Sequence, residues 1–332
     1  MQRSNAPAGG AWWDLWFQVV VGLFRQIGAL GRELRGSRGR YVVIAIPMIW
    51  LLAFFLAPLL VVLKISLAQR TGGVPPYSDL VTLGEQGLVQ VNLSFAGYAR
   101  LLSDPLYLES YLSSLQFASI STLACLLIGY PIAYGIARAS AGWRLFLLTL
   151  VVLPFWTSSL LRTYALTGLL RDNGMVNQLL MAIGFTDAPI RLIDTPFAVY
   201  VGITYNYLPF MVLPLVANLM RLDFTLLQAA ADLGAKPWRA FLSVTLPLSL
   251  PGIIAGSLLV FIPAVGEYVI PALLGGPESM TIGQRIWEDF FSGRNYPLAA
   301  AVAMAMLALI VVPMMLFEYF QERRAEREER RA

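Results

Sequence analysis

Polar side chains inside long apolar stretches are the residues of this chain that could do chemistry. A charged group at membrane depth is expensive, so it is usually paired or lies along the path of a solute. Aromatic rings beside such a group offer faces and hydroxyl groups that can contact a polar or cationic solute. The residues that we expect to line such a path are Trp156, Arg162, Tyr164, Tyr205, Tyr207, Glu267 and Tyr268.

Motifs for catalysis and for nucleotide or metal binding are absent from the sequence. There is no G-x-x-x-x-G-K-[ST] loop for nucleotide phosphates, no G-x-S-x-G nucleophile elbow and no H-E-x-x-H zinc motif. The chain contains no His and one Cys, Cys125, which excludes an internal disulfide and a Cys-based metal site. We therefore expect no catalytic residue, no metal and no cofactor. If ATP drives this protein, another polypeptide must hydrolyse it.

The polar groups also allow a structural interpretation. Arg162 and Glu267 could form an ion pair or lie at the membrane interface, and each tyrosine could pack with its hydroxyl bonded to a neighbouring helix. A rise of about 1.5 Å per residue along continuous helices places Glu267 and Arg162 near the outer interface and Tyr205 and Tyr207 nearer the middle of the membrane. The sequence leaves both interpretations open.

The composition is that of a membrane protein. Of 332 residues 58% are hydrophobic and only 13% are charged, whereas soluble domains carry about 25% charged residues. Six apolar runs come close to the roughly 20 residues that a membrane-spanning helix needs. Prolines within them favour bent or broken helices. We predict an all-α polytopic membrane protein with spans at 41–63, 110–137, 145–170, 195–220, 247–274 and 296–317.

Basic residues indicate the orientation of the spans. Arginines precede the first span, and basic residues follow the second and the fourth span and fill the C-terminal tail, which places both termini and the 221–247 loop in the cytoplasm. The Trp-rich stretch 11–30 predicts an amphipathic interfacial helix. The tail 321–332 mixes both charge signs and predicts a solvated extension of the last helix, with no role in nucleic-acid binding. The expected segments are 1–40, the transmembrane domain 41–320 and the tail 321–332.

The 221–247 loop is a polar interruption between two long apolar runs. Thr225 and Gln228 form a T-x-x-Q pattern that predicts a capping box at the start of a short helix. Gly234 and Pro237 predict the end of that helix. The small residues at 229–231 allow a partner to approach closely. The helix could dock into another protein or merely join two membrane spans.

The sequence of this loop resembles the signature loop of bacterial binding-protein-dependent ABC importer permeases. That signature reads E-A-A-x-x-x-G, nine variable positions and I-x-L-P; here Gln228-Ala229-Ala230 leads to Gly234, and Val244-Thr245-Leu246-Pro247 follows. The resemblance implies the type I importer permease fold and a coupling helix seated on a cytoplasmic ABC ATPase. Gln228 replaces the family's Glu and removes its charge. The implied ATPase-coupling residues are Gln228, Ala229, Ala230, Asp232, Gly234, Ala235, Leu246 and Pro247.

Other motifs resemble, more narrowly, the first permease subunit of spermidine/putrescine importers. They include L-P-F-W-T-S-S from Leu153, R-T-Y from Arg162 and G-E-Y-V-I-P-A-L-L-G-G from Gly266, in a resemblance that covers residues 41–320. It implies a bacterial inner-membrane location. The implied partners are a periplasmic polyamine-binding protein, a second permease subunit and cytoplasmic ATPase subunits.

The expected pathway residues only partly suit a polyamine. A linear polycation favours carboxylates and aromatic faces, which Glu267 and the pathway Tyr and Trp residues could supply. The positive charge of Arg162 disfavours a polycation. The alternatives are import of another small solute on the same architecture, an ion-driven secondary transporter and a membrane scaffold protein. A secondary transporter would need an ion site near the middle of the membrane, and none is evident.

Overall fold

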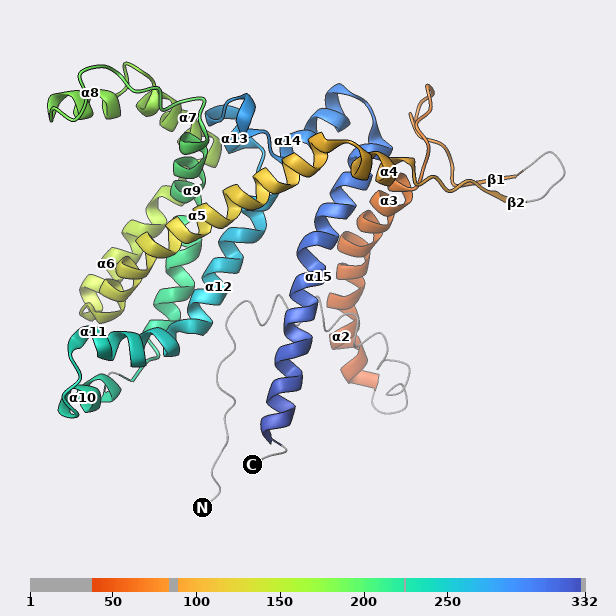
Figure 1. The fold of residues 1–332 in the computed structure, drawn as a ribbon. Coiled ribbons are helices and arrows are strands. Elements are labelled where there is room, and N and C mark those ends of the chain that lie inside the picture. Colours follow the sequence, from red (N-terminus) through yellow and green to blue (C-terminus); the bar gives the residue numbers. More distant parts are fainter. Residues whose placement is uncertain (1–37, 84–88, 224, 330–332) are drawn as a thin grey trace. The chain divides into compact units, whose positions relative to one another are not determined.

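The computed structural model describes residues 38–83, 89–223 and 225–329 (Figure 1). The chain forms two compact units, one from Met1–Arg100 with Arg294–Ala332 and the other from Leu101–Gly293. The expected interfacial helix at 11–30 lies outside the described residues. Five described helices are long and apolar enough to span a membrane, and there are six spans if one bent pair of helices is counted as a single broken span. The predicted all-α membrane fold is therefore confirmed, apart from one small hairpin.

The first unit contains the first and the last span. The first span comprises α2 (Arg38–Leu51), the π-helical turn η1 (Leu52–Leu56) and α3 (Ala57–Ser66). The last helix, α15 (Tyr296–Glu329), packs against α3 and continues into the charged tail, as predicted.

The segment between the first and second predicted spans contains secondary structure. Strands β1 (Val81–Leu83) and β2 (Val89–Val91) form an antiparallel hairpin, and α4 (Ala96–Ser103) follows.

Three helices form the core of the second unit: α5 (Pro105–Arg138), α9 (Pro196–Leu219) and α12 (Leu246–Val265), which pack against one another in pairs. Small residues allow the close approach, as is common in membrane bundles. A Cβ atom added at Gly256 would lie 2.8 Å from the Sδ atom of Met211, and one at Gly129 would lie 3.2 Å from its Cγ. Met211 is fully buried.

The third span is not the continuous helix that we predicted at 145–170. It consists of α6 (Ala141–Val152), the 3₁₀ turn η2 (Leu153–Trp156), α7 (Ser159–Leu170) and α8 (Met175–Ala182), with a bend of 90° between Trp156 and Ser159. Pro154 removes a backbone donor, Thr157 is extended, and Ser158 has a non-helical ψ of 137°. The straight helix from which we derived the depth of Arg162 is therefore wrong.

The fifth span is also shorter than the predicted 247–274 helix. Its α12 ends at Val265, and a separate helix, α13 (Val269–Leu274), follows a break at Gly266–Tyr268. The chain continues through η4 (Pro277–Ser279), α14 (Ile282–Trp287) and the π-helical turn η5 (Glu288–Ser292).

Within the second unit, the two ends of the bundle carry different elements (Figure 1). The short helices α10 (Thr225–Asp232) and α11 (Pro237–Ala240) lie at one end. Helices α7, α8, α13 and α14 lie at the other. The predicted loop helix is therefore separated along the bundle from the polar residues near Glu267.

Candidate functional site

The short helix α10 exists where the loop sequence predicts it, but a different residue caps it. The Thr225 N–H donates to Oδ1 of Asp223 at 2.9 Å, and this bond lowers the pKa of the Asp223 carboxyl from its ordinary value. The predicted box between Thr225 and Gln228 is wrong, because Asp223 already supplies the capping oxygen two residues earlier.

The end of α10 is a Schellman motif centred on Gly234. The Gly234 N–H donates to the Ala231 carbonyl at 2.8 Å, and the Ala235 N–H donates to the Ala230 carbonyl at 3.0 Å. The motif requires a left-handed residue, and Gly234 has φ of +80°. The predicted helix end is therefore confirmed, and Pro237 begins α11.

The expected ATPase-coupling residues fall on two elements. Gln228, Ala229 and Asp232 are exposed on α10, and Ala230 is half-buried there. Gly234 and Ala235 form the turn after it, while Leu246 and Pro247 begin α12. The loop therefore presents a short helix whose surface is open in this chain.

At the other end of the second unit, Glu267 is bound by three groups. Its Oε2 accepts a hydrogen bond from the Tyr207 hydroxyl at 2.6 Å, and its Oε1 accepts from the N–H groups of Val269 at 2.9 Å and Ile270 at 3.3 Å. Tyr207 and Glu267, which we expected at different depths, thus lie at one level. The carboxylate fixes the first turn of α13 and ties it to α9.

Arg162 is buried near this carboxylate's partners but does not pair with it. Its side chain is 9% exposed, and its Nε and Nη1 atoms have no hydrogen-bond partner among the described residues. Its Cζ atom lies 4.9 Å from the centre of the Phe155 ring. A desolvated cation–π contact can contribute about 2 kcal/mol. The ion pair with Glu267 that we considered is absent from the ion pairs of the described residues.

Aromatic rings connect Arg162 with Tyr207. Phe155 contacts Phe210 edge to face with 5.0 Å between ring centres, and Phe210 lies 5.9 Å from the Tyr207 ring. Asn206, next in the chain to Tyr207, is also buried and donates from Nδ2 to Oγ1 of Thr163 at 3.2 Å. The structure therefore gathers a guanidinium, three rings and a carboxylate in one region of the second unit.

The remaining expected pathway residues are not in the contacts described above, although Trp156 follows Phe155 and Tyr268 follows Glu267 in the chain. Trp156 and Tyr164 are 87% and 60% exposed in this chain. Tyr268 stacks on Trp287, with ring centres 4.8 Å apart. Tyr205 lines a small apolar cavity of about 170 Å³. The described residues contain no group of three or more His, Cys, Asp or Glu side chains placed to hold a metal.

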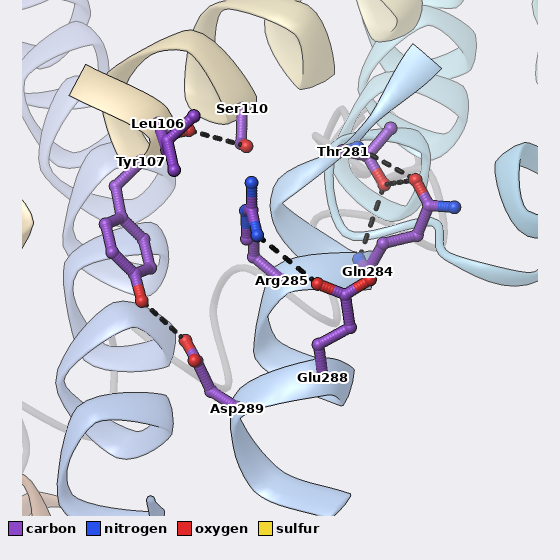
Figure 2. A network of polar contacts seen from close by, with 8 residues as sticks. All are labelled: Leu106, Tyr107, Ser110, Thr281, Gln284, Arg285, Glu288 and Asp289. Atoms are coloured by element: carbon purple, nitrogen blue, oxygen red, sulfur yellow. Dashed lines mark hydrogen bonds and ion pairs between the residues drawn. The ribbon is translucent and has the colours of Figure 1, made fainter. Parts of the chain in front are cut away.

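A polar network around α14 was missed in the sequence (Figure 2). Thr281 and Gln284 form a reciprocal capping box, and Arg285 pairs with Glu288 at 3.3 Å. Tyr107 of α5 donates to Asp289 at 2.9 Å. The T-x-x-Q pattern at 281–284 is the signal that could have predicted this helix, since we applied the same pattern at 225–228.

The α14 network also supports the segment that contains Glu267. The Thr281 hydroxyl donates to the Glu267 carbonyl at 3.1 Å. The Ile282 N–H donates to Oγ of the buried Ser114 on α5 at 2.8 Å. Helix α14 therefore holds the break after α12 against α5 and positions the carboxylate.

Comparisons with known proteins agree on one kind of protein. A family model described as "Binding-protein-dependent transport system inner membrane component" matches residues 37–326. The chain is 38% identical, over 87% of its length and 96% of the relative, to the spermidine/putrescine transport system permease protein PotB of Haemophilus influenzae. It is 40% identical to PotB of Escherichia coli K12, over 83% of the chain and 94% of that protein.

A solved structure shares the fold. It is that of a bacterial ABC transporter involved in the import of the acidic polysaccharide alginate. The match has a TM-score of 0.62 and 19% identity and covers 90% of this chain and 99% of the other. At this identity the likeness concerns the fold alone.

Proposed function

The chain belongs to the family of binding-protein-dependent transport system inner membrane components, and from this membership we infer that its function is transport. It is accordingly a multi-pass inner-membrane permease subunit of an importer. The apolar helices of the structure have the lengths that this role requires.

The substrate that we propose is a polyamine such as spermidine or putrescine. The observation that carries this proposal is 38–40% identity, over more than four fifths of the chain, to permease proteins of spermidine/putrescine transport systems. The site gives physical support, because the Glu267 carboxylate lies beside aromatic rings, which together suit a protonated amine.

Arg162 favours a second candidate substrate. Its buried guanidinium lacks hydrogen-bond partners at Nε and Nη1 and would suit a solute that carries an anionic group. The same permease architecture would then import that solute. This candidate has no support from the relatives named above.

We further propose the partners. A periplasmic binding protein delivers the substrate, a second related permease subunit completes the pathway, and separate cytoplasmic ABC ATPase subunits hydrolyse ATP and bind α10 through the coupling residues named above. The exposed surface of α10 and its tight end at Gly234 support a docking role. The permease itself is the non-catalytic member of this assembly.

Uptake by the reconstituted complex tests the substrate. We expect proteoliposomes with the complete complex and its binding protein to accumulate radiolabelled spermidine or putrescine when ATP is supplied on the α10 side. A dicarboxylate such as succinate serves as the anionic control. ATP-dependent accumulation of the anion without accumulation of either polyamine would establish the second candidate instead.

Cysteine labelling tests the proposed orientation, in which both termini and α10 are cytoplasmic. In a Cys125→Ser background, Ala235→Cys should react with a membrane-impermeant maleimide only in inverted vesicles. Ala188→Cys, in the exposed segment after α8 at the other end of the second unit, should react in intact spheroplasts. The reverse pattern would invert the topology and exclude α10 as the ATPase contact.

A further inference from the structure

The coupling loop is joined to the helical bundle at both ends, to α9 before it and to α12 after it. Helix α10 packs on α11 and on the π-helical turn η3 (Phe241–Thr245). Helix α11, η3 and α12 continue into one another as a single helical run, Pro237–Val265. A displacement of α10 therefore acts directly on α11 and η3, in addition to its short link to α9.

Pro247 lies two residues after the widened turn η3. A proline ring clashes with the carbonyl four residues earlier, which here belongs to Ser243. In η3 the Leu246 N–H donates to the Phe241 carbonyl, a bond that skips one residue more than an α-helix and enlarges the turn. The widened turn relieves the clash and keeps the run continuous.

The first span repeats this arrangement. In η1 the Ala57 N–H donates to the Leu52 carbonyl, and Pro58 follows directly. The spacing between the start of the turn and the proline is the same as in η3. A proline thus follows η1 and η3 at the same spacing, whereas Pro251 and Pro263 lie inside α12 without a widened turn.

The ring of Phe241 projects from this turn onto α5. It meets the Tyr130 ring edge to face at 5.6 Å and 90°, and the Tyr134 ring at 6.0 Å and 89°. Tyr130 is buried, and its hydroxyl is 2.9 Å from Oγ of Ser249 on α12. Phe241 thus packs against the Tyr130 and Tyr134 rings, which lie one turn apart on α5.

The contact continues to the end of α5. Tyr134 accepts a hydrogen bond from Nη1 of Arg138 at 3.0 Å, and the Arg138 Cζ atom lies 5.5 Å from its ring centre. Arg138 is the last residue of α5. The two neighbours that follow Phe241 in η3, Leu242 and Ser243, are exposed. Val244 is half-buried and Thr245 is buried in the same turn, and Phe241 is the aromatic side chain of η3, with ring contacts to α5.

We propose that Phe241 is a positioning residue that transmits movement of α10 to α5. The proposal rests on the proposed function, in which α10 binds the ATPase. The widened turn lets 237–245 shift against α12, while the edge-to-face contacts with Tyr130 and Tyr134 carry that shift to α5. Loss of the ring should separate ATP hydrolysis from transport without preventing assembly.

Phe241→Leu tests this in the complete complex, because it keeps an apolar side chain and removes the ring. We expect normal co-purification with the ATPase and unchanged basal hydrolysis. We expect the polyamine taken up per ATP hydrolysed to fall about tenfold, in the usual range of coupling between distant sites. Phe241→Tyr keeps the ring and should restore the wild-type ratio. Leu242→Ala, on the exposed side of the same turn, should have no effect.

Tyr134→Leu removes a ring partner on α5 and should reproduce the loss. The double variant Phe241→Leu with Tyr134→Leu should be no worse than either single variant, because both interrupt one contact. A wild-type ratio in Phe241→Leu overturns the proposal, as does loss of assembly in both single variants. If the ATPase does not bind through α10, the proposed function fails instead. Normal ATPase binding by Gly234→Val would show this independently of the Phe241 variants.

Discussion

Gly234→Val should abolish transport by weakening the contact between α10 and the ATPase. Gly234 has φ of +80°, a conformation that a β-branched residue rarely adopts, although no neighbouring atom lies within 4 Å of an added Cβ. The strain is about 1–3 kcal/mol, enough to open the Schellman motif and unwind the end of α10. ATPase co-purification and ATP-dependent uptake are the measurements.

Gly184 provides a matched control for this substitution. It has φ of +72°, ends α8 in the same motif, with Phe185 N–H to Leu180 and Gly184 N–H to Met181, and likewise has open space around it. Gly184→Val therefore imposes the same strain at the other end of the unit and should leave ATPase binding intact. Gly234→Asn should be tolerated, because Asn adopts the left-handed conformation more readily. Normal ATPase binding and uptake in Gly234→Val would show that the loop only connects α9 with α12.

Glu267→Gln should lower polyamine uptake about tenfold while leaving assembly and thermal stability unchanged. A glutamine amide can accept from the N–H groups of Val269 and Ile270 and donate to the Tyr207 oxygen, so it preserves the bonds that hold α13. It removes only the charge. At an effective dielectric constant near 20 that charge contributes about 1–2 kcal/mol to a cation roughly 8–16 Å away, or about tenfold in apparent affinity.

Glu267→Ala separates this electrostatic effect from a structural one. It removes every acceptor and leaves the Tyr207 hydroxyl and the Val269 and Ile270 N–H groups unpaired, at roughly 1–3 kcal/mol for each buried group. The complex should then lose thermal stability as well as uptake, as measured by a thermal-shift assay alongside transport. If Glu267→Gln transports normally and only the alanine variant fails, Glu267 is structural and lies off the substrate pathway.

The two parts of the candidate site differ in how far the sequence predicts them. The end of α10 at Gly234 was predictable, because a helix stop acts within a few residues and the left-handed conformation is a property of glycine itself. The cap at Asp223 was misassigned to Thr225, since both residues can cap and the sequence does not say which oxygen reaches the helix. The box at Thr281 and Gln284 carried the same local signal and was simply overlooked.

Proline shows why the broken spans could not be placed. Pro154 coincides with a break and a 90° bend, whereas α9 continues through Pro209 and Pro214 and α15 continues through Pro313. A helix tolerates proline when neighbouring groups satisfy the freed backbone carbonyls. Those neighbours belong to other helices, so the outcome depends on packing and not on the proline alone.

The sequence by itself determined the membrane class, the six apolar runs, the family signature and the loop helix that ends at Gly234. These features follow from composition, run length and turn chemistry, which act over a few residues. Only the tertiary structure decided that Glu267 binds Tyr207 instead of Arg162, and that Phe241 meets two rings of α5. The bond between Tyr207 and Glu267 joins residues 60 positions apart, and such pairs are set by how whole helices pack.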